Sequence, residues 1–390
     1  MNIGILTTSY FPEYTGASLR VDGLARGLHS YGYKVSIFAP GETFSKEPLP
    51  YGVLYRIPVR RNRLANFLER YTKFNFARYF AFSHALPSLL REEKICLIHA
   101  RQPLDFFLIG HKMKKMMSLV FVVEAHKLLG LTDYENKQIP FFLKSILLAC
   151  ERKGMNRSDL VITMTSSGLK TLRTHGVTPP VVIVHNASTL QAPSRGVSPL
   201  PNVKYVFYAG NLRDVEGIDH LLDSFLLMKN TIPGLKCVLA GGGDIKKWKS
   251  YAKNIGLALD TIFLGEVPQK KLATYYQHAL LFAYPRKNLT YHHDIIGLKI
   301  YDALRMGVPI VTSDVGELGE LIRKEGVGLT SRPEDNSDFA RTALTLLTDE
   351  KLYARIKKNV ARLQHHFDWE TACKPLAQTY DSLLREKRRK

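Results

Sequence analysis

The segment His293-Asp-Ile-Ile-Gly-Leu-Lys-Ile-Tyr-Asp-Ala-Leu-Arg-Met-Gly-Val-Pro-Ile-Val311 decides the fold of the second half of this chain. Its apolar residues recur at helical spacing over residues 298–306, which predicts a helix ended by Gly307. The apolar run over residues 308–312 then predicts a strand buried in a parallel sheet. A helix followed directly by a buried strand is the repeating unit of an α/β domain.

The same segment has the features of an anion-binding site. Gly297 precedes the predicted helix, so backbone N–H groups of the helix start can approach a phosphate, which the helix dipole favours by about 0.3–1 kcal/mol. Asp294 lies just before the helix start and Asp302 lies about two turns inside the helix. A nucleotide diphosphate sugar fits this pattern, with its diphosphate at the helix start, sugar hydroxyls on Asp294 and ribose hydroxyls on Asp302. The alternative is a fortuitous spacing in which one Asp only caps a helix.

Short apolar runs alternate with amphipathic helical segments along the chain, which predicts two doubly wound, Rossmann-like α/β domains facing a cleft. A stretch rich in Pro and Ser, residues 191–201, is the predicted linker between a domain of residues 1–190 and a domain of residues 202–367. The strands expected in the first domain are 2–9, 34–39, 53–58, 95–99, 120–124, 161–164 and 181–184. Those expected in the second, besides 308–312, are 205–209, 237–240, 261–264 and 280–284.

The composition predicts a cytoplasmic protein with two cores. The 390 residues are 45% hydrophobic, and a single core stops growing near ~250–300 residues. The N-terminus lacks the features of a signal peptide, and no apolar run reaches the ~18 residues of a membrane span. The best run, residues 139–150, is interrupted by Lys144 and is expected to be a packed helix. The four cysteines show no metal or disulfide spacing, which predicts a reduced cytoplasmic protein. No metal site and no cofactor are expected.

The net charge of +20 predicts anionic partners. Residues 56–80 interleave cations with aromatics, partly at helical spacing, which predicts a peripheral contact with an anionic membrane surface on its cytoplasmic face. The expected membrane face is Arg60, Arg61, Arg63, Phe67, Arg70 and Lys73, extended by Lys112, Lys114 and Lys115. The alternative is a solvated surface over ordinary core packing. No nucleic-acid-binding motif accompanies these residues, so nucleic acid is not expected as a partner.

Characteristic short motifs follow one another along nearly the whole chain. They are residues 5–16 with 24–35, 184–188, 210–217, 239–244, 263–267, the Asp294-x7-Asp302 block with 307–316 and Glu320, and Phe367-Asp-Trp-Glu370 before a last helix. In this order they resemble the retaining glycosyltransferases of family four (glycosyl transferases group 1), which have the GT-B fold. The resemblance implies an N-terminal acceptor-binding domain, a C-terminal donor domain, and a last helix, about residues 368–390, that packs back on the N-terminal domain.

The resemblance also assigns roles to individual residues. His126 follows the predicted strand 120–124 and matches a histidine placed against the donor sugar, which Asp294 is also expected to hold; a structural histidine is the alternative. Gly16 matches a glycine that lets the backbone approach a phosphate or the acceptor, and its alternative is a turn glycine at positive φ. The expected donor-binding set is Gly16, Gly210, Asn211, Arg213, Gly241, Gly242, Leu264, Val267, Gly297, Leu298 and Asp302.

The chain departs from the family at the loop of residues 210–217. Where the family commonly has an Arg and a Lys, this chain has Asn211 and Glu216. Two other cations are expected to hold the diphosphate instead, first Lys299 in the first turn of the predicted helix and then Arg213; the alternative is that both are solvated surface cations. The expected catalytic set is His126, Asp294 and Lys299. Both carboxylates of the Asp-x7-Asp block are one methylene shorter than the usual Glu.

The predicted function is transfer of a sugar from a UDP- or GDP-type nucleotide diphosphate sugar to a lipid-linked or polysaccharide acceptor, as in cell-envelope polysaccharide biosynthesis. The resemblance implies retention of anomeric configuration and no metal requirement. Two other hypotheses stand beside it. One is a nucleotide-sugar epimerase on the same scaffold. The other is a non-catalytic nucleotide-sugar-binding homologue, suggested by Asn211, Glu216 and the two Asp-for-Glu changes.

Overall fold

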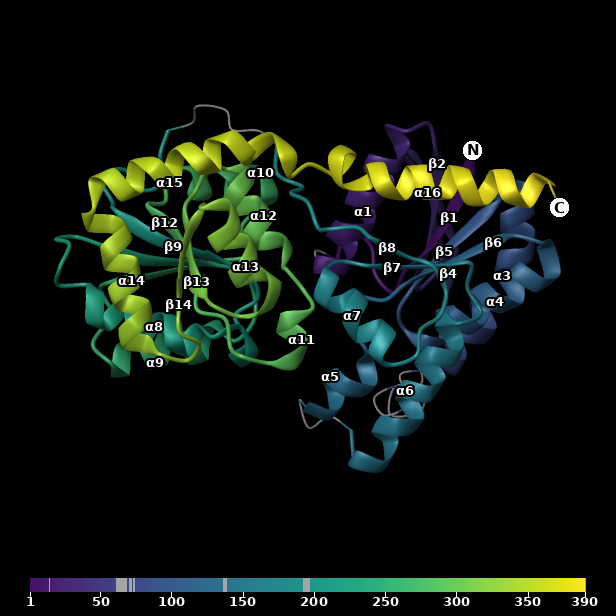
Figure 1. Cartoon of the computed structure of the whole chain (residues 1–390), viewed down its shortest axis with the longest axis horizontal. Helices are drawn as coiled ribbons and strands as arrows, with labels where there is room; N and C mark the ends of the chain where they lie inside the picture. Colours follow the sequence, from purple (N-terminus) through teal and green to yellow (C-terminus); the bar gives the residue numbers. More distant parts are fainter. Residues whose placement is uncertain are drawn as a thin grey trace. The chain divides into compact units, whose positions relative to one another are not determined.

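The chain forms two compact units (Figure 1). The computed structural model describes residues 1–13, 15–60, 69, 72, 74–135, 139–191 and 197–389. The first unit is Met1–Asn186 with Trp369–Lys390, and the second is Ala187–Asp368. The boundary between the units, after Asn186, precedes the expected linker at 191–201. Ser188 already bonds to Asp302, and Leu190 already packs in the core of the second unit.

The first unit contains a mostly parallel sheet. Its strands are β1 (Asn2–Leu6), β2 (Lys34–Gly41), β3 (Ser45–Leu49), β4 (Gly52–Pro58), β5 (Leu97–Arg101), β6 (Val120–Glu124), β7 (Leu160–Thr163) and β8 (Val181–Ile183). Their order across the sheet, within the described residues, is β3-β4-β2-β1-β5-β6-β7-β8. Only β3 is antiparallel to its neighbour. The central strands β5, β6 and β7 are buried along their whole length, as expected for strands covered by helices on both faces.

The helices of this unit include one from the far end of the chain. They are α1 (Gly16–His29), α3 (Phe76–Glu92), α4 (Leu104–Met117), α5 (Leu129–Glu135), α6 (Phe141–Met155), α7 (Ser166–Thr174) and the C-terminal α16 (Trp369–Arg389). Helix α16 packs closely on α1. A Cβ on Gly27 of α1 would lie 2.3 Å from the backbone oxygen of Trp369, so only a residue without a side chain permits this approach.

The second unit is built around an all-parallel sheet of order β11-β10-β9-β12-β13-β14. Its strands are β9 (Tyr205–Ala209), β10 (Lys236–Ala240), β11 (Thr261–Gly265), β12 (Leu281–Tyr284), β13 (Ile310–Ser313) and β14 (Gly328–Ser331). Its helices are α8 (Ile218–Met228), α9 (Ile245–Asn254), α10 (Gln269–Gln277), α11 (Thr290–His293), α12 (Leu298–Arg305), α13 (Gly316–Glu325), α14 (Asn336–Thr348) and α15 (Glu350–Leu363). Parallel strands place their carboxyl ends at one edge, where ligands of such sheets bind.

The predicted fold class of two Rossmann-like α/β domains is confirmed, and the helix expected at 298–306 is α12. Three details differ from expectation. Strand β3 was missed because it is an edge strand that contains Pro48, and β14 was missed because Leu329 is the one large apolar residue among its four. The helix expected to be packed over residues 139–150 is α6, whose first half is exposed at Phe141, Phe142 and Ile146.

The contact between α1 and α16 generates a stability prediction. Gly27→Ala adds a methyl group that must displace Trp369, so we expect a loss of about 1–3 kcal/mol in the free energy of unfolding, measured by urea denaturation. Gly16→Ala is the matched control, because it adds the same group to the same helix where no atom lies within 4 Å. Equal stabilities of the two variants would show that the close packing of α16 on α1 does not contribute.

Candidate active site

Glycines line the carboxyl edge of the second sheet. Gly210 follows β9 and Gly241 follows β10, and the N–H groups of these two residues donate to the oxygens of Ala240 (2.9 Å) and Gly265 (2.7 Å). A Cβ on Gly241 would lie 1.9 Å from the oxygen of Gly210. The structure therefore brings together the predicted donor residues Gly210 and Gly241 as backbone without side chains. Gly242 follows directly, and Leu264 and Val267 flank the same edge as half-buried residues.

Helix α12 begins beside these loops. Gly297 is its N-cap, and no side chain caps the helix start, so the first backbone N–H groups, beginning at Leu298, keep their capacity to bind an anion. Asp294 lies buried in the turn between α11 and α12. Arg286 stabilises that turn. It is 3% exposed, and its guanidinium donates to the backbone oxygen of Ile295 at 2.6 Å.

Asp302 lies inside α12 and is also buried. Its Oδ1 accepts the hydroxyl hydrogen of Ser188 at 2.7 Å, and the Ser188 N–H in turn donates to the oxygen of Phe367 at 2.9 Å. Burial raises the pKa of Asp302 to about 7, although the hydrogen bonds from Ser188 and from the Thr189 backbone oppose this. The ribose-binding role of Asp302 stays a prediction, and the structure adds that its charge changes near neutral pH.

Lys299 is a largely buried cation, with 16% of its side chain exposed. Its Nζ donates to Glu216 Oε2 at 2.7 Å and to the Tyr208 hydroxyl at 3.0 Å. The same ammonium lies over the rings of Tyr208 and Tyr284, 4.9 and 4.6 Å from their centroids. A Cβ on Gly210 would lie 2.6 Å from Nζ, so the ammonium directly adjoins the first glycine loop. The interpretation of Lys299 as a solvated surface cation is wrong.

Arg213 and Asn211 are placed differently. The side chain of Arg213 is 64% exposed, and its nearest carboxylate oxygen is Glu216 Oε1 at 3.6 Å. Asn211 is also exposed. For Arg213 the structure therefore agrees with the alternative interpretation of a solvated cation, because a surface ion pair of this length contributes little.

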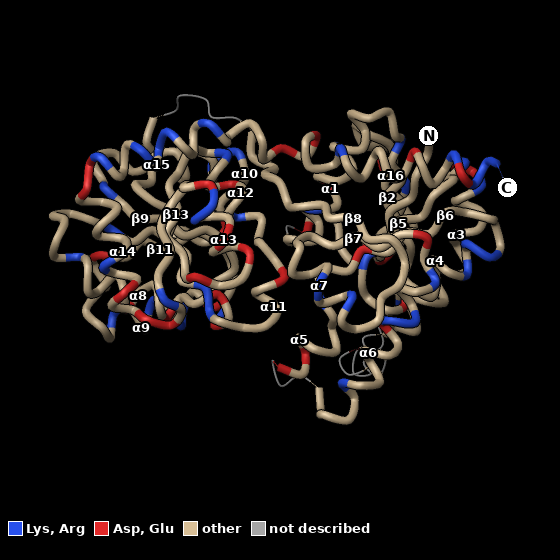
Figure 2. The backbone as a smooth tube through the Cα atoms, in the orientation of Figure 1, with Lys and Arg blue, Asp and Glu red and all other residues tan. Residues whose placement is uncertain are grey.

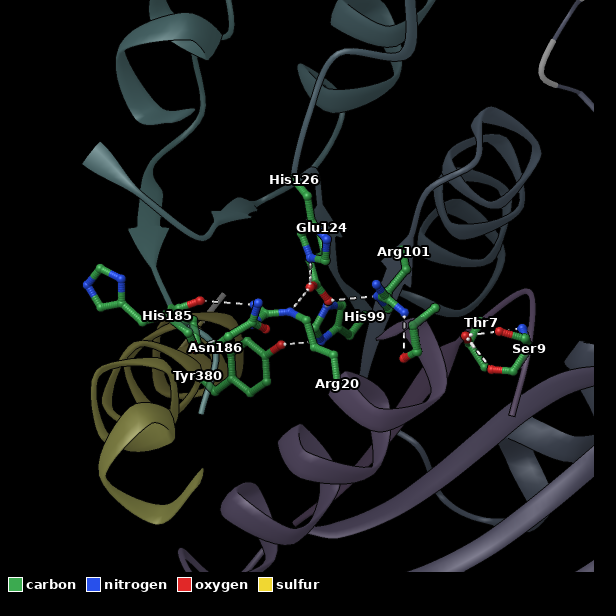
Figure 3. A network of polar contacts seen from close by, with 12 residues as sticks. Thr7, Ser9, Arg20, His99, Arg101, Glu124, His126, His185, Asn186 and Tyr380 are labelled. Atoms are coloured by element: carbon green, nitrogen blue, oxygen red, sulfur yellow. Dashed lines mark hydrogen bonds and ion pairs between the residues drawn. The ribbon is translucent and has the colours of Figure 1, made fainter. Parts of the chain in front are cut away.

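A second cluster lies at the carboxyl edge of the first sheet, centred on the buried carboxylate of Glu124 (Figure 3). Glu124 ends β6. Its two oxygens accept from Arg20 of α1 at 2.5 Å, from His99 of β5 at 2.8 Å, and from His126 Nε2, while Arg101 lies at 3.3 Å. Burial alone would raise the pKa of Glu124, but the positive charge of Arg20, together with His126 and Arg101, holds it well below its usual range.

Segments far apart in the sequence complete this cluster. The Arg20 guanidinium also donates to the oxygen of Val184 at 3.0 Å and to Asn186 Oδ1 at 2.9 Å, which ties α1 to the end of β8. The Tyr380 hydroxyl of α16 lies 3.0 Å from His99 Nδ1. The network therefore joins strands, helix α1 and the C-terminal helix in one arrangement (Figure 3).

His126 belongs to the Glu124 network and is also partly accessible to solvent. It lies after β6 as expected, and its Nε2 contacts Glu124 while its side chain remains 17% exposed. Burial lowers the pKa of His126 to about 4, against the opposing charge of Glu124, so the imidazole is neutral at neutral pH. The sugar-binding role stays a prediction, and the structural interpretation is supported by the contact with Glu124.

Gly16 is the first residue of α1, after the N-cap Thr15, whose side chain accepts from the Ser18 N–H. Gly16 is not among the residues at positive φ, so its interpretation as a turn glycine in the left-handed region is wrong. A Cβ at this position would meet no atom within 4 Å. The open space over the helix start is compatible with the approach of a ligand.

The predicted membrane face is described only in part. Arg61, Arg63, Phe67, Arg70 and Lys73 lie outside the described residues. Arg60 and Lys115 are exposed and Lys112 is half-buried. Lys114 is paired with Asp159 at 2.6 Å and is half-buried, and its role as a membrane cation stays a prediction. Figure 2 shows further Lys and Arg at the end of α16, where Arg385, Lys387, Arg388 and Arg389 lie. Within the part of the chain that the structure describes, no helix is both long and apolar enough to span a membrane.

Several residues of the two clusters were missed in the sequence. They are Arg20, Arg101, Glu124, Asn186, Ser188, Tyr208, Tyr284, Arg286 and Tyr380. A signal existed for Glu124 and Arg101, because each is a charged residue that ends an apolar strand, where active-site residues of parallel sheets are found. No local signal marks Tyr380, which meets His99 only through the packing of α16.

Comparison with known proteins places both halves in glycosyltransferase families. Residues 14–191 match the family described as Glycosyltransferase Family 4, and residues 193–363 match the family described as Glycosyl transferases group 1. Glycogen synthase of Mycobacterium tuberculosis is 26% identical over 245 residues, which are 62% of this chain and 58% of that protein. The chain thus aligns with little more than half the length of this relative.

Solved structures agree over the whole chain. Sucrose-phosphate synthase from Thermosynechococcus elongatus has a TM-score of 0.80 at 21% identity and covers 99% of both chains. Anabaena Alr3699/HepE, solved in complex with UDP and glucose, has a TM-score of 0.73 at 16% identity and covers 98% of this chain and 100% of its own. These similarities define the GT-B fold class. The chain carries a Glycosyltransferase Family 4 domain followed by a glycosyl transferases group 1 domain.

The low pKa of His126 generates a pH prediction. Between about pH 4 and 6.5 an unfolded chain protonates this histidine while the folded chain does not, so its contribution to stability is lost as pH falls through that window. Burial raises the pKa of Asp302 and of Glu151 to about 7, and these carboxyls act in the opposite direction because they stabilise the folded chain as pH falls. The prediction is therefore a difference: relative to His126→Gln, the urea midpoint of the parent should fall between about pH 7 and pH 5. Some slope should remain in the variant, because burial lowers the pKa of His292 to about 3. Identical slopes would contradict a neutral, buried His126.

Proposed function

We propose that this chain transfers a sugar from a nucleotide diphosphate sugar of the UDP or GDP type to a lipid-linked or saccharide acceptor, with retention of configuration and without a metal ion. One observation carries the donor part of this proposal. At the carboxyl edge of the second sheet, bare glycine backbone, the uncapped start of α12 and the buried ammonium of Lys299 adjoin one another. A diphosphate needs this combination of N–H groups and a cation with no side chains in the way.

The chemistry assigns the remaining roles. The barrier is the charge separation between an oxocarbenium-like sugar and the departing diphosphate. N–H groups of α12 and Lys299 would stabilise the negative charge that develops on the leaving group. The C–O bond to the diphosphate breaks as the acceptor oxygen bonds to the same face of the sugar, and the leaving phosphate takes the acceptor's proton. Asp294 would accept from sugar hydroxyls, and Asp302 from the ribose.

The relatives support the substrate classes without deciding them. The UDP and glucose in the Anabaena structure favour a UDP-sugar donor, and the similarity to a glycogen synthase favours a saccharide acceptor. No feature of the described residues favours an epimerase over a transferase.

A non-catalytic nucleotide-sugar-binding protein is the second candidate, and one observation favours it. Glu216 stands where the family commonly has a cation, and its carboxylate already neutralises Lys299. A chain that bound a nucleotide sugar but neither transferred nor hydrolysed the sugar would support this candidate.

We also propose that the protein associates with an anionic membrane surface. The net charge of +20, the exposed Arg60 and Lys115, and the exposed Phe141 and Phe142 at the start of α6 support this. The protein should co-sediment with vesicles that contain anionic lipid at low ionic strength and not with neutral vesicles. Equal recovery with both vesicle types would remove the electrostatic basis of the proposal.

The donor site is tested by Lys299→Met, which keeps the length of the side chain and removes its charge. Loss of a charge-assisted contact should weaken binding of UDP or GDP about 10- to 100-fold, measured by calorimetry, and lower the rate of transfer. Binding to the parent protein should be the same with and without EDTA. Lys236→Met is the matched control, because Lys236 pairs with Asp260 at 2.9 Å at the opposite, amino end of β10. If both variants bound nucleotide as the parent does, the donor site would be misassigned.

A further inference from the structure

The buried pair of Lys299 and Glu216 has a property that the proposed function leaves unexplained. Glu216 Oε2 lies 2.7 Å from the Lys299 ammonium and also accepts the hydroxyl hydrogen of Tyr284 at 3.0 Å. Lys299 and Glu216 are both largely buried, with 16% and 14% of their side chains exposed. The cation that adjoins the Gly210 loop therefore has a built-in counter-ion.

Lys299 is held by other groups besides Glu216. The Tyr208 hydroxyl accepts from Nζ at 3.0 Å, and the rings of Tyr208 and Tyr284 face the ammonium at 4.9 and 4.6 Å. Such cation–π contacts attract a desolvated ammonium to the ring faces, so the two tyrosines help to hold Lys299 in place. The distinctive contribution of Glu216 is therefore its negative charge.

That charge is present at every physiological pH. Burial alone would raise the pKa of Glu216, but Lys299, through its charge and its hydrogen bond, lowers it to about 2. The buried guanidinium of Arg286 also favours the ionised form. A permanent anion thus lies beside the ammonium that would receive the diphosphate of a donor.

We propose that Glu216 is an internal counter-ion that competes with the diphosphate of the donor for Lys299. It thereby weakens binding of nucleoside diphosphates and favours release of the spent nucleotide. This inference rests on the proposed function, because it takes the diphosphate to bind at the Gly210 loop. It concerns residues of the second unit only. Glu216 is a positioning residue and not a catalytic one, because its charge acts on the substrate through Lys299.

The decisive variant is Glu216→Gln, which keeps the size of the side chain and its ability to accept from Lys299 and Tyr284. Removal of one negative charge near a bound diphosphate should tighten binding about tenfold. This estimate takes an effective dielectric constant between that of water and that of a dry protein interior. The dissociation constants of UDP and GDP would be measured by calorimetry. A purely structural role would lower the melting temperature and leave the affinity unchanged or weaker.

Asp260→Asn is the matched control for the loss of charge. Asp260 accepts from Lys236 at 2.9 Å and Lys229 at 3.3 Å at the amino end of the sheet, so its removal changes the net charge by the same amount away from the Gly210 loop. We expect no change in nucleotide affinity in this variant. Equal tightening in both variants would overturn the inference, because the effect would then come from net charge alone.

A second comparison, between Lys299→Gln and a double variant, tests the inference without relying on the single variant Glu216→Gln. Lys299→Gln leaves Glu216 as an anion beside the diphosphate without the Lys299 ammonium, although the Tyr284 hydroxyl still donates to it and Arg213 lies at 3.6 Å. The double variant with Glu216→Gln removes that anion as well. The double variant should recover part of the affinity that Lys299→Gln loses. No recovery would overturn the inference.

The inference and the proposed function fail in different ways. Parent protein that binds UDP or GDP while Glu216→Gln binds no tighter would overturn the competition by Glu216 and leave the donor site intact. Parent protein and Glu216→Gln that both bind neither nucleotide would overturn the proposed function, and the inference with it.

Discussion

An ionised carboxylate lies at the carboxyl edge of each sheet, fully buried for Glu124 and largely buried for Glu216, and the arrangement around both edges depends on its neutralisation. An unpaired buried charge costs several kcal/mol, so cations must converge on it from separate elements. Around Glu124 they come from α1 and β5, and around Glu216 the cation comes from α12. Each carboxylate thereby links segments that are distant in the chain and fixes the helix starts relative to the strand ends.

The backbone beside the second ion pair must lack side chains. A side chain on Gly210 would displace the Lys299 ammonium from its present position, and the β9 and β10 loops can touch only because Gly241 has no side chain. The result is an edge where peptide groups and one ammonium face the same space. Preorganised donors of this kind stabilise developing negative charge without rearranging during the reaction, which is the main way that an enzyme can assist departure of a diphosphate.

The two sheet edges differ in which hydrogen-bonding groups remain free to bind a ligand. In the first unit the hydrogen-bonding groups of Arg20, His99 and Glu124 are used within the network, and His126 is its more accessible member. In the second unit the uncapped start of α12 keeps its capacity for an anion, while the N–H groups of Gly210 and Gly241 already donate to neighbouring backbone oxygens. The geometry thus favours a structural role for most of the first cluster and a ligand-binding role for the second.

The sequence by itself determined the fold class, because helical and strand periodicity are local. The predicted helix start indicated Gly297, and the resemblance to the family added Gly210 and Gly241; in the structure the Gly210 and Gly241 loops touch, and Lys299 of α12 adjoins Gly210. The pairing of Lys299 with Glu216, 83 residues apart, and the contact of Tyr380 with His99 were decided only by the tertiary structure. A charge's partner depends on which elements pack together, and no local pattern in the sequence records that.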